Sequence, residues 1–228
     1  MKITILSLFP EMFTHVFGTS MILHAKDIGA VTIDIINFRE FSTSKHKKVD
    51  DASFGGGPGM LLSIEPIYRA LNSIEGHETA TKILMTPQGM PYHQDKAKEL
   101  AMKDHIIIIC GHYEGFDERI RSLVNLEISI GDYVLTGGEI GAMAIVDSVS
   151  RLLPGVLSSE DSFIQESFYN GMLEYPQFTR PQDFMGMKVP EVLVSGNHQE
   201  VDKWRNEASM KRTKERRPDL LKKTVKKD

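Results

Sequence analysis

The chain of 228 residues has 41% hydrophobic and 25% charged residues, the composition of an ordinary soluble globular protein with one large domain or a medium domain plus a small appendage. No apolar stretch approaches membrane-spanning length, and Pro10 and Glu11 follow the first apolar run with no signal-peptide cleavage site, so we expect a cytoplasmic protein. The single cysteine, Cys110, excludes an intrachain disulfide, and the eight histidines show no pair at metal-ligand spacing, so we expect no structural zinc.

The formal net charge of −4 conceals a strong asymmetry. Residues 203–227 hold eleven of the 27 Lys and Arg residues and three of the 31 Asp and Glu residues, so this tail carries +8 and the rest of the chain −12. Such a tail suits a polyanionic partner, and a solvated basic helix on a globular protein is the ordinary alternative.

Strand and helix signals alternate near the N-terminus. Residues 3–8 are apolar and β-branched like a buried strand, Phe13, Val16 and Phe17 recur at helical spacing, and residues 31–36 read as a second strand. A helix between two strands predicts a parallel α/β sheet. Neither strand is followed by G-x-G-x-x-G, which counts against a Rossmann dinucleotide site.

Periodicity is lost over residues 39–62, which contain several lysines and the run FGGGPGM at 54–60. A loop this long inside a compact domain is typically functional or disordered. The glycines lack the Lys-Ser/Thr pair that completes a phosphate loop, so a P-loop is excluded. Two interpretations are left: a segment whose exposed backbone binds phosphates or forms a lid, and a plain flexible loop.

Three further strands are each followed by a glycine-bearing segment. Helices are expected over 64–71, capped by Ser63, and over 92–102, 116–124 and 141–152. The strands are expected at 82–85, 106–110 and 126–129, and they end in TPQG, GHYEG and IGDYVLTGGE. Because ligands bind at the carboxyl edge of open α/β sheets, these segments predict one pocket, with ordinary turn glycines as the alternative.

The C-terminal part differs in character. Residues 155–169 are polar and resemble a linker or a loop that becomes ordered, and the prolines at 176 and 181 favour rigid extended turns. Asn197 can cap a helix on which Val201, Trp204 and Ala208 share a face. We therefore predict a small helical domain with a basic surface.

Seven motifs, taken together, resemble one known family. They are FGGGPGM at 54–60, TPQG at 86–89, GHYEGFDER at 111–119, SIGDYVLTGGE at 129–139, RLLPGVL at 151–157, EDSF at 160–163 and YPQFTRP at 175–181. In this order they resemble the bacterial tRNA (guanine-N1)-methyltransferases of the TrmD family, and the similarity covers nearly the whole chain.

That resemblance implies the SPOUT class, an α/β fold whose parallel sheet carries a deep trefoil knot and is joined to a small, mainly helical C-terminal domain. The implied parts are a knotted cofactor-binding domain over 1–157, a linker over 158–170 and a tRNA-binding domain over 171–228. A knot would explain how S-adenosylmethionine binds without the usual glycine fingerprint. The residues expected around the cofactor are Thr86, Pro87, Gly89, Gly111, Tyr113, Ile130, Gly131, Asp132, Tyr133, Val134, Leu135, Gly137 and Gly138.

The family methylates ring nitrogen 1 of the guanine at position 37 of tRNA, just 3′ of the anticodon. By resemblance, Asp161 is the base that takes the N1 proton, Arg151 stabilises charge on the exocyclic oxygen and Glu114 accepts hydrogen bonds from the guanine edge. Each residue also has a plainer interpretation. Asp161 could be an ordinary exposed acid, Arg151 could cap the helix that ends there, and Glu114 could pair with Arg119 or Arg121. No metal is needed to carry the methyl group, and a dependence on magnesium is left open.

The resemblance also implies a homodimer in which Asp161 acts on the cofactor pocket of the other subunit. Two departures from the family pattern stand out: His112 replaces the commoner Arg before YEG, and the linker is shorter than in some members. A ribose 2′-O-methylating SPOUT enzyme and a non-catalytic RNA-binding protein are the alternative functions.

Overall fold

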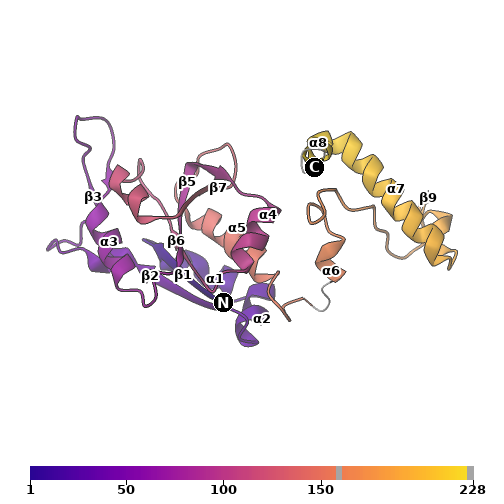
Figure 1. The fold of residues 1–228 in the computed structure, drawn as a ribbon, viewed down its shortest axis with the longest axis horizontal. Helices are drawn as coiled ribbons and strands as arrows, with labels where there is room; N and C mark the ends of the chain where they lie inside the picture. The colour runs from indigo at the N-terminus through magenta and orange to yellow at the C-terminus, as the bar shows by residue number, and fades with distance from the viewer. Residues whose placement is uncertain (158–160, 225–228) are drawn as a thin grey trace. The chain divides into compact units, whose positions relative to one another are not determined.

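The structure is a computed structural model that describes residues 1–157 and 161–224; the side chains of residues 161, 162, 223 and 224 are outside the described set. The chain forms two compact units, Met1–Ser158 and Ser159–Asp228 (Figure 1). Each unit is described by itself below.

The first unit is built on a five-stranded sheet in the order β2-β1-β6-β5-β7. Its strands are β1 (Lys2–Ser7), β2 (Thr32–Asn37), β5 (Thr81–Pro91), β6 (His105–Ile109) and β7 (Leu126–Ser129). Every pairing in this sheet is parallel. The predicted parallel α/β fold is therefore confirmed.

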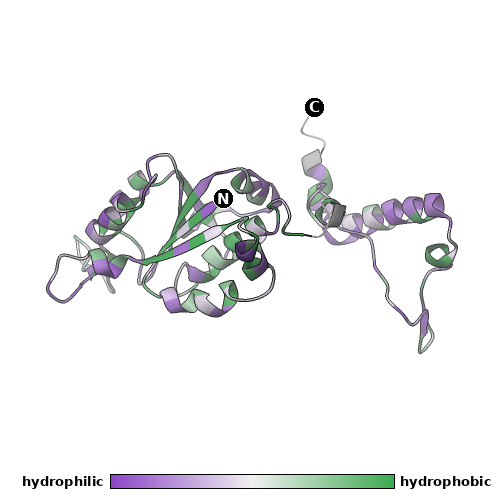
Figure 2. Cartoon of the chain, turned by 90° about the horizontal axis from the view of Figure 1, so that it is seen from below, coloured by the Kyte–Doolittle hydropathy of each residue, from purple (hydrophilic) through white to green (hydrophobic). Residues whose placement is uncertain are grey.

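The run of four isoleucines explains why β6 lies at the centre of the sheet. Ile106 and Ile108 belong to the core cluster on one face, and Ile107 and Ile109 to the cluster on the other. Alternate residues of a strand point to opposite faces, so a continuous apolar run suits a strand that is buried on both sides. Long green stretches mark such apolar strands in Figure 2.

Helices cover both faces of the sheet (Figure 1). One core cluster takes residues from α1 (Thr14–Phe17), α2 (Ser20–Asp27), α4 (Gln94–Ala101) and α5 (Glu139–Ser150). The other takes residues from α3 (Ile64–Asn72) and the 3-10 helices η2 (Phe38–Phe41) and η3 (Glu118–Leu123). A third 3-10 helix, η1 (Pro10–Phe13), precedes α1.

Two local predictions were wrong. The helix expected over 116–124 is the 3-10 helix η3, in which Ile120 and Leu123 both pack on the core. The apolar residues Phe116, Ile120, Leu123 and Val124 fit an α-helical spacing, whereas Ile120 and Leu123 alone fit the three-residue repeat of the 3-10 helix that forms. Ser63 does not cap α3 through its side chain; its N–H instead donates to the Val49 carbonyl at 2.8 Å.

The sequence predicted that TPQG is a turn after a strand. In the structure these four residues are part of β5. Met85 and Met90 are both opposite Ile128 of β7, so the four residues between them bulge out of the ladder. Two residues facing one partner define a bulge, which bends a strand and is common beside active sites. The strand thus resumes after the segment that the sequence marked as its end.

The aperiodic segment 39–62 includes most of η2 and a short antiparallel hairpin of β3 (Asp50–Asp51) and β4 (Leu61–Leu62). FGGGPGM lies in the loop between these two strands. Its Gly59 has φ +78°, and a Cβ there would lie 2.2 Å from the Glu114 Cγ. The glycine therefore lets this loop pack directly on the segment that follows β6.

The second unit contains α6 (Asp161–Ile164), β8 (Asp183–Phe184), β9 (Met187–Lys188), the 3-10 helix η4 (Glu191–Val194), α7 (His198–Arg216) and α8 (Pro218–Thr224). The predicted cap is confirmed, because the Asn197 side chain accepts from the Glu200 N–H at 3.4 Å. Within the stretch 155–169, residues Asp161–Ile164 form α6, and the Phe163 ring packs on Tyr169 at 5.2 Å.

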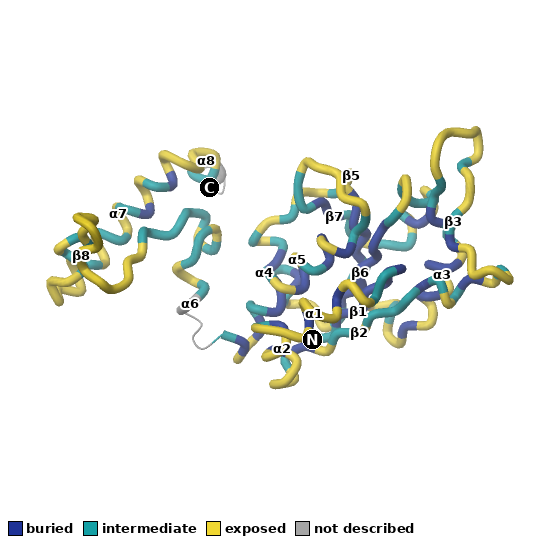
Figure 3. The backbone as a smooth tube through the Cα atoms, turned by 180° about the vertical axis from the view of Figure 1, so that it is seen from behind, coloured by how far each residue is buried: buried dark blue, intermediate teal, exposed yellow. Residues whose placement is uncertain are grey.

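Little apolar surface is buried in this second unit. Ser209 and Thr213 are its buried residues among those described, and they hold the backbone of Leu173: Ser209 Oγ donates to its carbonyl at 2.6 Å and Thr213 Oγ1 accepts from its N–H at 2.9 Å. Every buried hydrophobic residue of the described chain belongs to the first unit. Figure 3 accordingly shows the second unit mostly yellow and teal, and α7 is mostly purple in Figure 2.

The thiol of Cys110, at the end of β6, is buried as predicted. Burial raises its pKa well above the usual value, and the nearby Glu139 carboxylate raises it further. Because the thiolate is the reactive form, the native thiol should not react with Ellman's reagent at mildly alkaline pH. We expect one thiol to appear only after denaturation in urea; rapid reaction of the folded protein would contradict this burial.

Within the described part of the chain, no helix is both long and apolar enough to cross a membrane.

Candidate functional site

A cavity of about 290 Å³ opens at the carboxyl edge of the sheet. Its walls come from the β5 bulge, the segment after β6, the segment after β7 and the start of α5, so the three glycine-bearing segments do meet at one pocket. All the residues predicted around a cofactor line it except two, Gly89 and Asp132. Gly89 instead lies against the β7 backbone, and Asp132 is exposed.

Glycine is required where two backbones meet under this pocket. A Cβ on Gly138 would lie 2.8 Å from the Cys110 Cα, 2.9 Å from the Gly111 N and 2.9 Å from the Met85 Cβ. The Gly138 N–H also donates to the Gly111 carbonyl at 2.9 Å. The loop after β7 is thus pressed onto the end of β6, which places the two walls in contact.

His112 points into the protein, a placement that the sequence did not predict. Its ring packs on Phe9 with centroids 4.9 Å apart and meets Tyr113 edge-on at 5.2 Å. The residue lines the pocket, and its Nδ1 is buried without a hydrogen-bond partner among the described residues. An unsatisfied buried polar atom is rare, so a bound group or a water is expected to pair with it.

Glu139 is a second residue that sequence reasoning missed. It is 2% exposed, and the Ser7 hydroxyl donates to its Oε1 at 2.7 Å. Ser7 Oγ in turn accepts from the Phe9 N–H at 2.9 Å. Glu139 begins α5, where a negative charge favours the helix dipole. This buried pair ties the start of α5, and the loop before it, to the end of β1.

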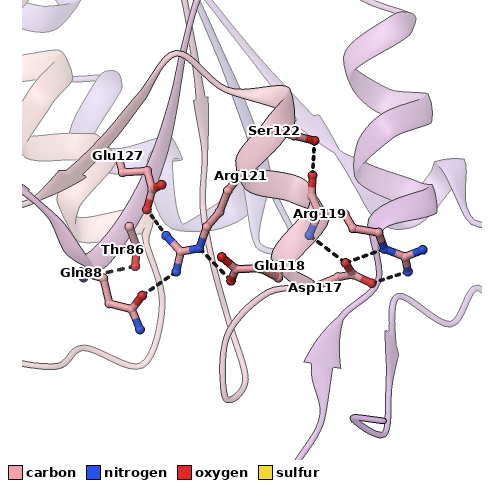
Figure 4. Close-up of polar contacts among 8 residues, drawn as sticks. All are labelled: Thr86, Gln88, Asp117, Glu118, Arg119, Arg121, Ser122 and Glu127. Atoms are coloured by element: carbon pink, nitrogen blue, oxygen red, sulfur yellow. Dashed lines mark hydrogen bonds and ion pairs between the residues drawn. The ribbon is translucent and has the colours of Figure 1, made fainter.

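Arg121 of η3 joins three parts of the pocket rim (Figure 4). Its guanidinium donates to Glu118 Oε2 at 2.9 Å, to Gln88 Oε1 at 2.7 Å and to Glu127. Gln88, Glu118 and Arg121 all line the cavity. Glu118 and Glu127 are near Arg121 in the chain, but Gln88 is 33 residues away, so no short-range pattern predicts the contact that joins the two sides of the rim.

Glu114 lines the pocket, and the alternative reading, an ion pair with Arg119 or Arg121, does not form. Arg119 pairs with Asp117, whose pKa it lowers by hydrogen bonding, and Arg121 pairs as described above. Among the described residues no hydrogen bond or ion pair engages the Glu114 carboxylate. This exposed carboxylate is therefore available to a ligand at the pocket mouth.

Arg151, the second predicted catalytic residue, does not line this cavity in the first unit. Arg151 is half-buried just after α5, and its N–H donates to the Asp147 carbonyl at 3.2 Å. Asp161 begins α6 in the second unit, and its side chain lies outside the described residues. Within the first unit, Glu114 therefore lines the pocket and Arg151 does not.

The described residues contain no group of three or more His, Cys, Asp or Glu that could hold a metal ion. The lining combines apolar side chains such as Ile130 and Leu135 with backbone at Gly111 and Gly138. Its volume is near the lower end of the roughly 300–1,000 Å³ usual for ligand sites. Together with the unpaired His112 Nδ1, this lining fits a small ligand with both apolar and polar parts.

The fold and the pocket define an α/β protein with a ligand site at the carboxyl edge of a parallel sheet, built without a dinucleotide fingerprint. Residues 1–223 match the family described as tRNA (Guanine-1)-methyltransferase TrmD. The chain belongs to this family, as the motifs predicted.

Three relatives illustrate the match, each named tRNA (guanine-N(1)-)-methyltransferase. The relative from Halalkalibacterium halodurans is 58% identical over 97% of this chain and 91% of its own. The relative from Shouchella clausii is 55% identical over 97% of this chain and 92% of its own. The relative from Brevibacillus brevis is 54% identical over 98% of this chain and 92% of its own.

Proposed function

We propose that this protein transfers the methyl group of S-adenosylmethionine to N1 of the guanine at position 37 of tRNA. Membership of the family is the observation that carries the proposal, because the family name specifies methylation of tRNA at position 1 of a guanine ring. It favours this acceptor over a ribose hydroxyl and over a non-catalytic role. Nucleoside mass spectrometry of treated tRNA tests it: we expect N1-methylguanosine, and a 2′-O-methylated nucleoside would overturn it.

The pocket at the carboxyl edge is the proposed cofactor site. Apolar contacts from Ile130 and Leu135 and backbone groups at Gly111 and Gly138 would hold S-adenosylmethionine, and the His112 Nδ1 gains a partner. Bound there, the cofactor supplies a methyl group made electrophilic by its sulfonium. We also propose that the segments around this pocket form the trefoil knot of the SPOUT class.

The acceptor nitrogen of guanine carries a proton, so the chain must supply a base. A positioned carboxylate typically contributes about a hundred- to ten-thousand-fold. We assign this role to Asp161 on the strength of the EDSF motif. As the proton leaves, charge grows on the exocyclic oxygen, where the Arg151 guanidinium would stabilise it. Glu114, which has a free carboxylate at the pocket, would accept hydrogen bonds from the guanine edge.

We also propose that the protein is a homodimer, and the small amount of apolar burial among the described residues of the second unit supports this. None of its described hydrophobic residues is buried. Small units that bury little apolar surface are usually stabilised by association. We therefore propose a three-part chain, with a cofactor domain over 1–157, a linker over 158–170 and a tRNA-binding domain over 171–228, in which Asp161 serves the partner's pocket. A tRNA substrate also favours a cytoplasmic location.

Shared sites predict complementation between two inactive variants. Asp161→Ala removes the proposed base, and Gly138→Trp fills the pocket. A mixed dimer retains one intact pocket facing one intact Asp161, so mixing the two inactive proteins should restore part of the methyl transfer. Heterodimers are verified with two affinity tags, and tagged parent chains mixed in the same way serve as the control. No recovery in verified heterodimers would contradict a site shared between subunits.

The basic tail predicts that the affinity for tRNA falls as the salt concentration rises. Lys211 and Lys214 are exposed on α7. Each phosphate that such residues neutralise contributes about −0.7 to −0.9 to the slope of log affinity against log salt. Replacing both by Gln should reduce this slope in filter binding, whereas Lys103→Gln on the first unit should not. Affinity that stays flat as salt increases would remove the tail from tRNA binding.

A further inference from the structure

The β5 bulge is a wall of the pocket that the sheet itself does not hold. Residues 86–89 lie between Met85 and Met90, which share Ile128 as their partner on β7. These four residues therefore have no place in the ladder with β7. Thr86, Pro87 and Gln88 nevertheless line the cavity, so other contacts must fix their position.

One contact within the bulge and one against β7 hold its ends. Thr86 Oγ1 accepts from the Gln88 N–H at 3.3 Å. Gly89 lies so close to β7 that a Cβ would be 2.4 Å from the Ile128 N. These contacts fix the two ends of the bulge and leave the Gln88 side chain at its exposed tip.

Arg121 supplies the contact that reaches this tip. Its Nη2 donates to Gln88 Oε1 at 2.7 Å, while its other nitrogens are held by Glu118 on η3 and Glu127 on β7. The Arg121 side chain is 22% exposed and Glu127 is 31% exposed, so this pair is partly shielded from solvent. Figure 4 shows the guanidinium between the three partners.

The chemistry of arginine suits this bridge. A guanidinium is planar and carries donors in a fixed fork, so contacts on two sides determine the direction of the third. Anchored by Glu118 and Glu127, Arg121 presents one N–H at a defined position to Gln88. A lysine has a single ammonium on a flexible stem and cannot reproduce that geometry.

We propose that Arg121 is a positioning residue: through Gln88 it fixes the 86–89 bulge as a preformed wall of the cofactor pocket. The identity of the ligand rests on the proposed function. Arg121 acts through Gln88 and needs no contact with the ligand. Holding the wall in place before binding reduces the ordering cost of the complex, so the bridge should strengthen binding.

The test is a double-mutant cycle with S-adenosylhomocysteine, the demethylated form of the cofactor, which binds without turnover. Calorimetry compares the parent, Gln88→Met, Arg121→Met and the double variant; methionine keeps an unbranched side chain but removes the polar partner. We expect each single change to weaken binding about ten-fold, in line with loss of a charge-assisted hydrogen bond, and the double change to be no worse than either. Arg121→Lys should behave like Arg121→Met.

Arg119→Met is the matched control. Arg119 is in the same 3-10 helix, is 69% exposed and pairs with Asp117, and it does not line the cavity. Its loss should leave binding unchanged. Hydrogen exchange gives a second readout: the amides of Gln88 and Gly89 should exchange faster in both Gln88→Met and Arg121→Met, with the melting temperature little changed for the exposed Gln88.

The outcomes separate the two proposals. If the parent fails to bind S-adenosylhomocysteine, the cofactor assignment is wrong. If the parent binds and Arg121→Met or Gln88→Met binds equally well, the positioning role is wrong and the cofactor site stands. Fully additive losses in the double variant would likewise overturn the bridge.

Discussion

Asp161→Asn is expected to slow methyl transfer to tRNA by about a hundred- to ten-thousand-fold, the usual contribution of a positioned base. The amide keeps the size of the carboxylate but cannot accept the N1 proton. The loss should appear in single-turnover rates, because the chemical step itself is impaired. Binding of the cofactor and of tRNA should change little.

Asp183→Asn is a suitable control in the same unit. Asp183 accepts from the Gly186 N–H at 2.9 Å in the β8–β9 hairpin, and an Asn oxygen can accept the same bond. This variant should methylate tRNA at the parent rate. An Asp161→Asn protein that is as fast as the parent would exclude Asp161 as the base and leave the family assignment intact.

Gly138→Ala should reduce both the affinity of the pocket for its ligand and the stability of the fold. The added methyl group would lie within 3 Å of three atoms, two of them backbone at Cys110 and Gly111. Backbone cannot swing aside as a side chain does, so the loop after β7 must move away from β6. Overpacking of this kind costs about 1–3 kcal/mol of unfolding free energy. Affinity for S-adenosylhomocysteine should fall at least as far as for Arg121→Met.

Gly76→Ala distinguishes this effect from general backbone strain. Gly76 has φ +74°, and a Cβ there would meet nothing within 4 Å. Its replacement costs about 1–2 kcal/mol for a left-handed conformation, far from the pocket. Thermal unfolding should report a loss in both variants and calorimetry a loss of binding in Gly138→Ala alone. Undiminished binding by Gly138→Ala would contradict the close contact of the two walls.

The strands could be predicted because burial on both faces leaves a clear mark in sequence. The run Ile106–Ile109 fills both core clusters, and no polar residue interrupts it. The bulge in β5 could not be predicted in the same way. Its existence depends on Ile128 facing both Met85 and Met90, a register set by packing between distant segments. Locally, Pro87 and Gly89 carry the usual signals of a turn.

The pocket followed from the rule that parallel strands end at one edge, so its three segments were predictable. Its polar framework was not. The His112 ring packs on Phe9, the buried Glu139 carboxylate accepts from Ser7, and Arg121 pairs with Gln88 across the pocket rim. No short-range pattern reports such pairs. The role assigned to Asp161 likewise comes from family resemblance, because an acid in a polar stretch is by itself unremarkable chemistry.

Methyl transfer from labelled S-adenosylmethionine to two tRNA transcripts that differ at one base tests the central claim most directly. The purified protein should label the transcript with guanine at position 37 and leave the transcript with adenine there unlabelled, and Gly138→Trp should label neither. Equal labelling of both transcripts, or none of either by a protein that binds the cofactor, would contradict the account.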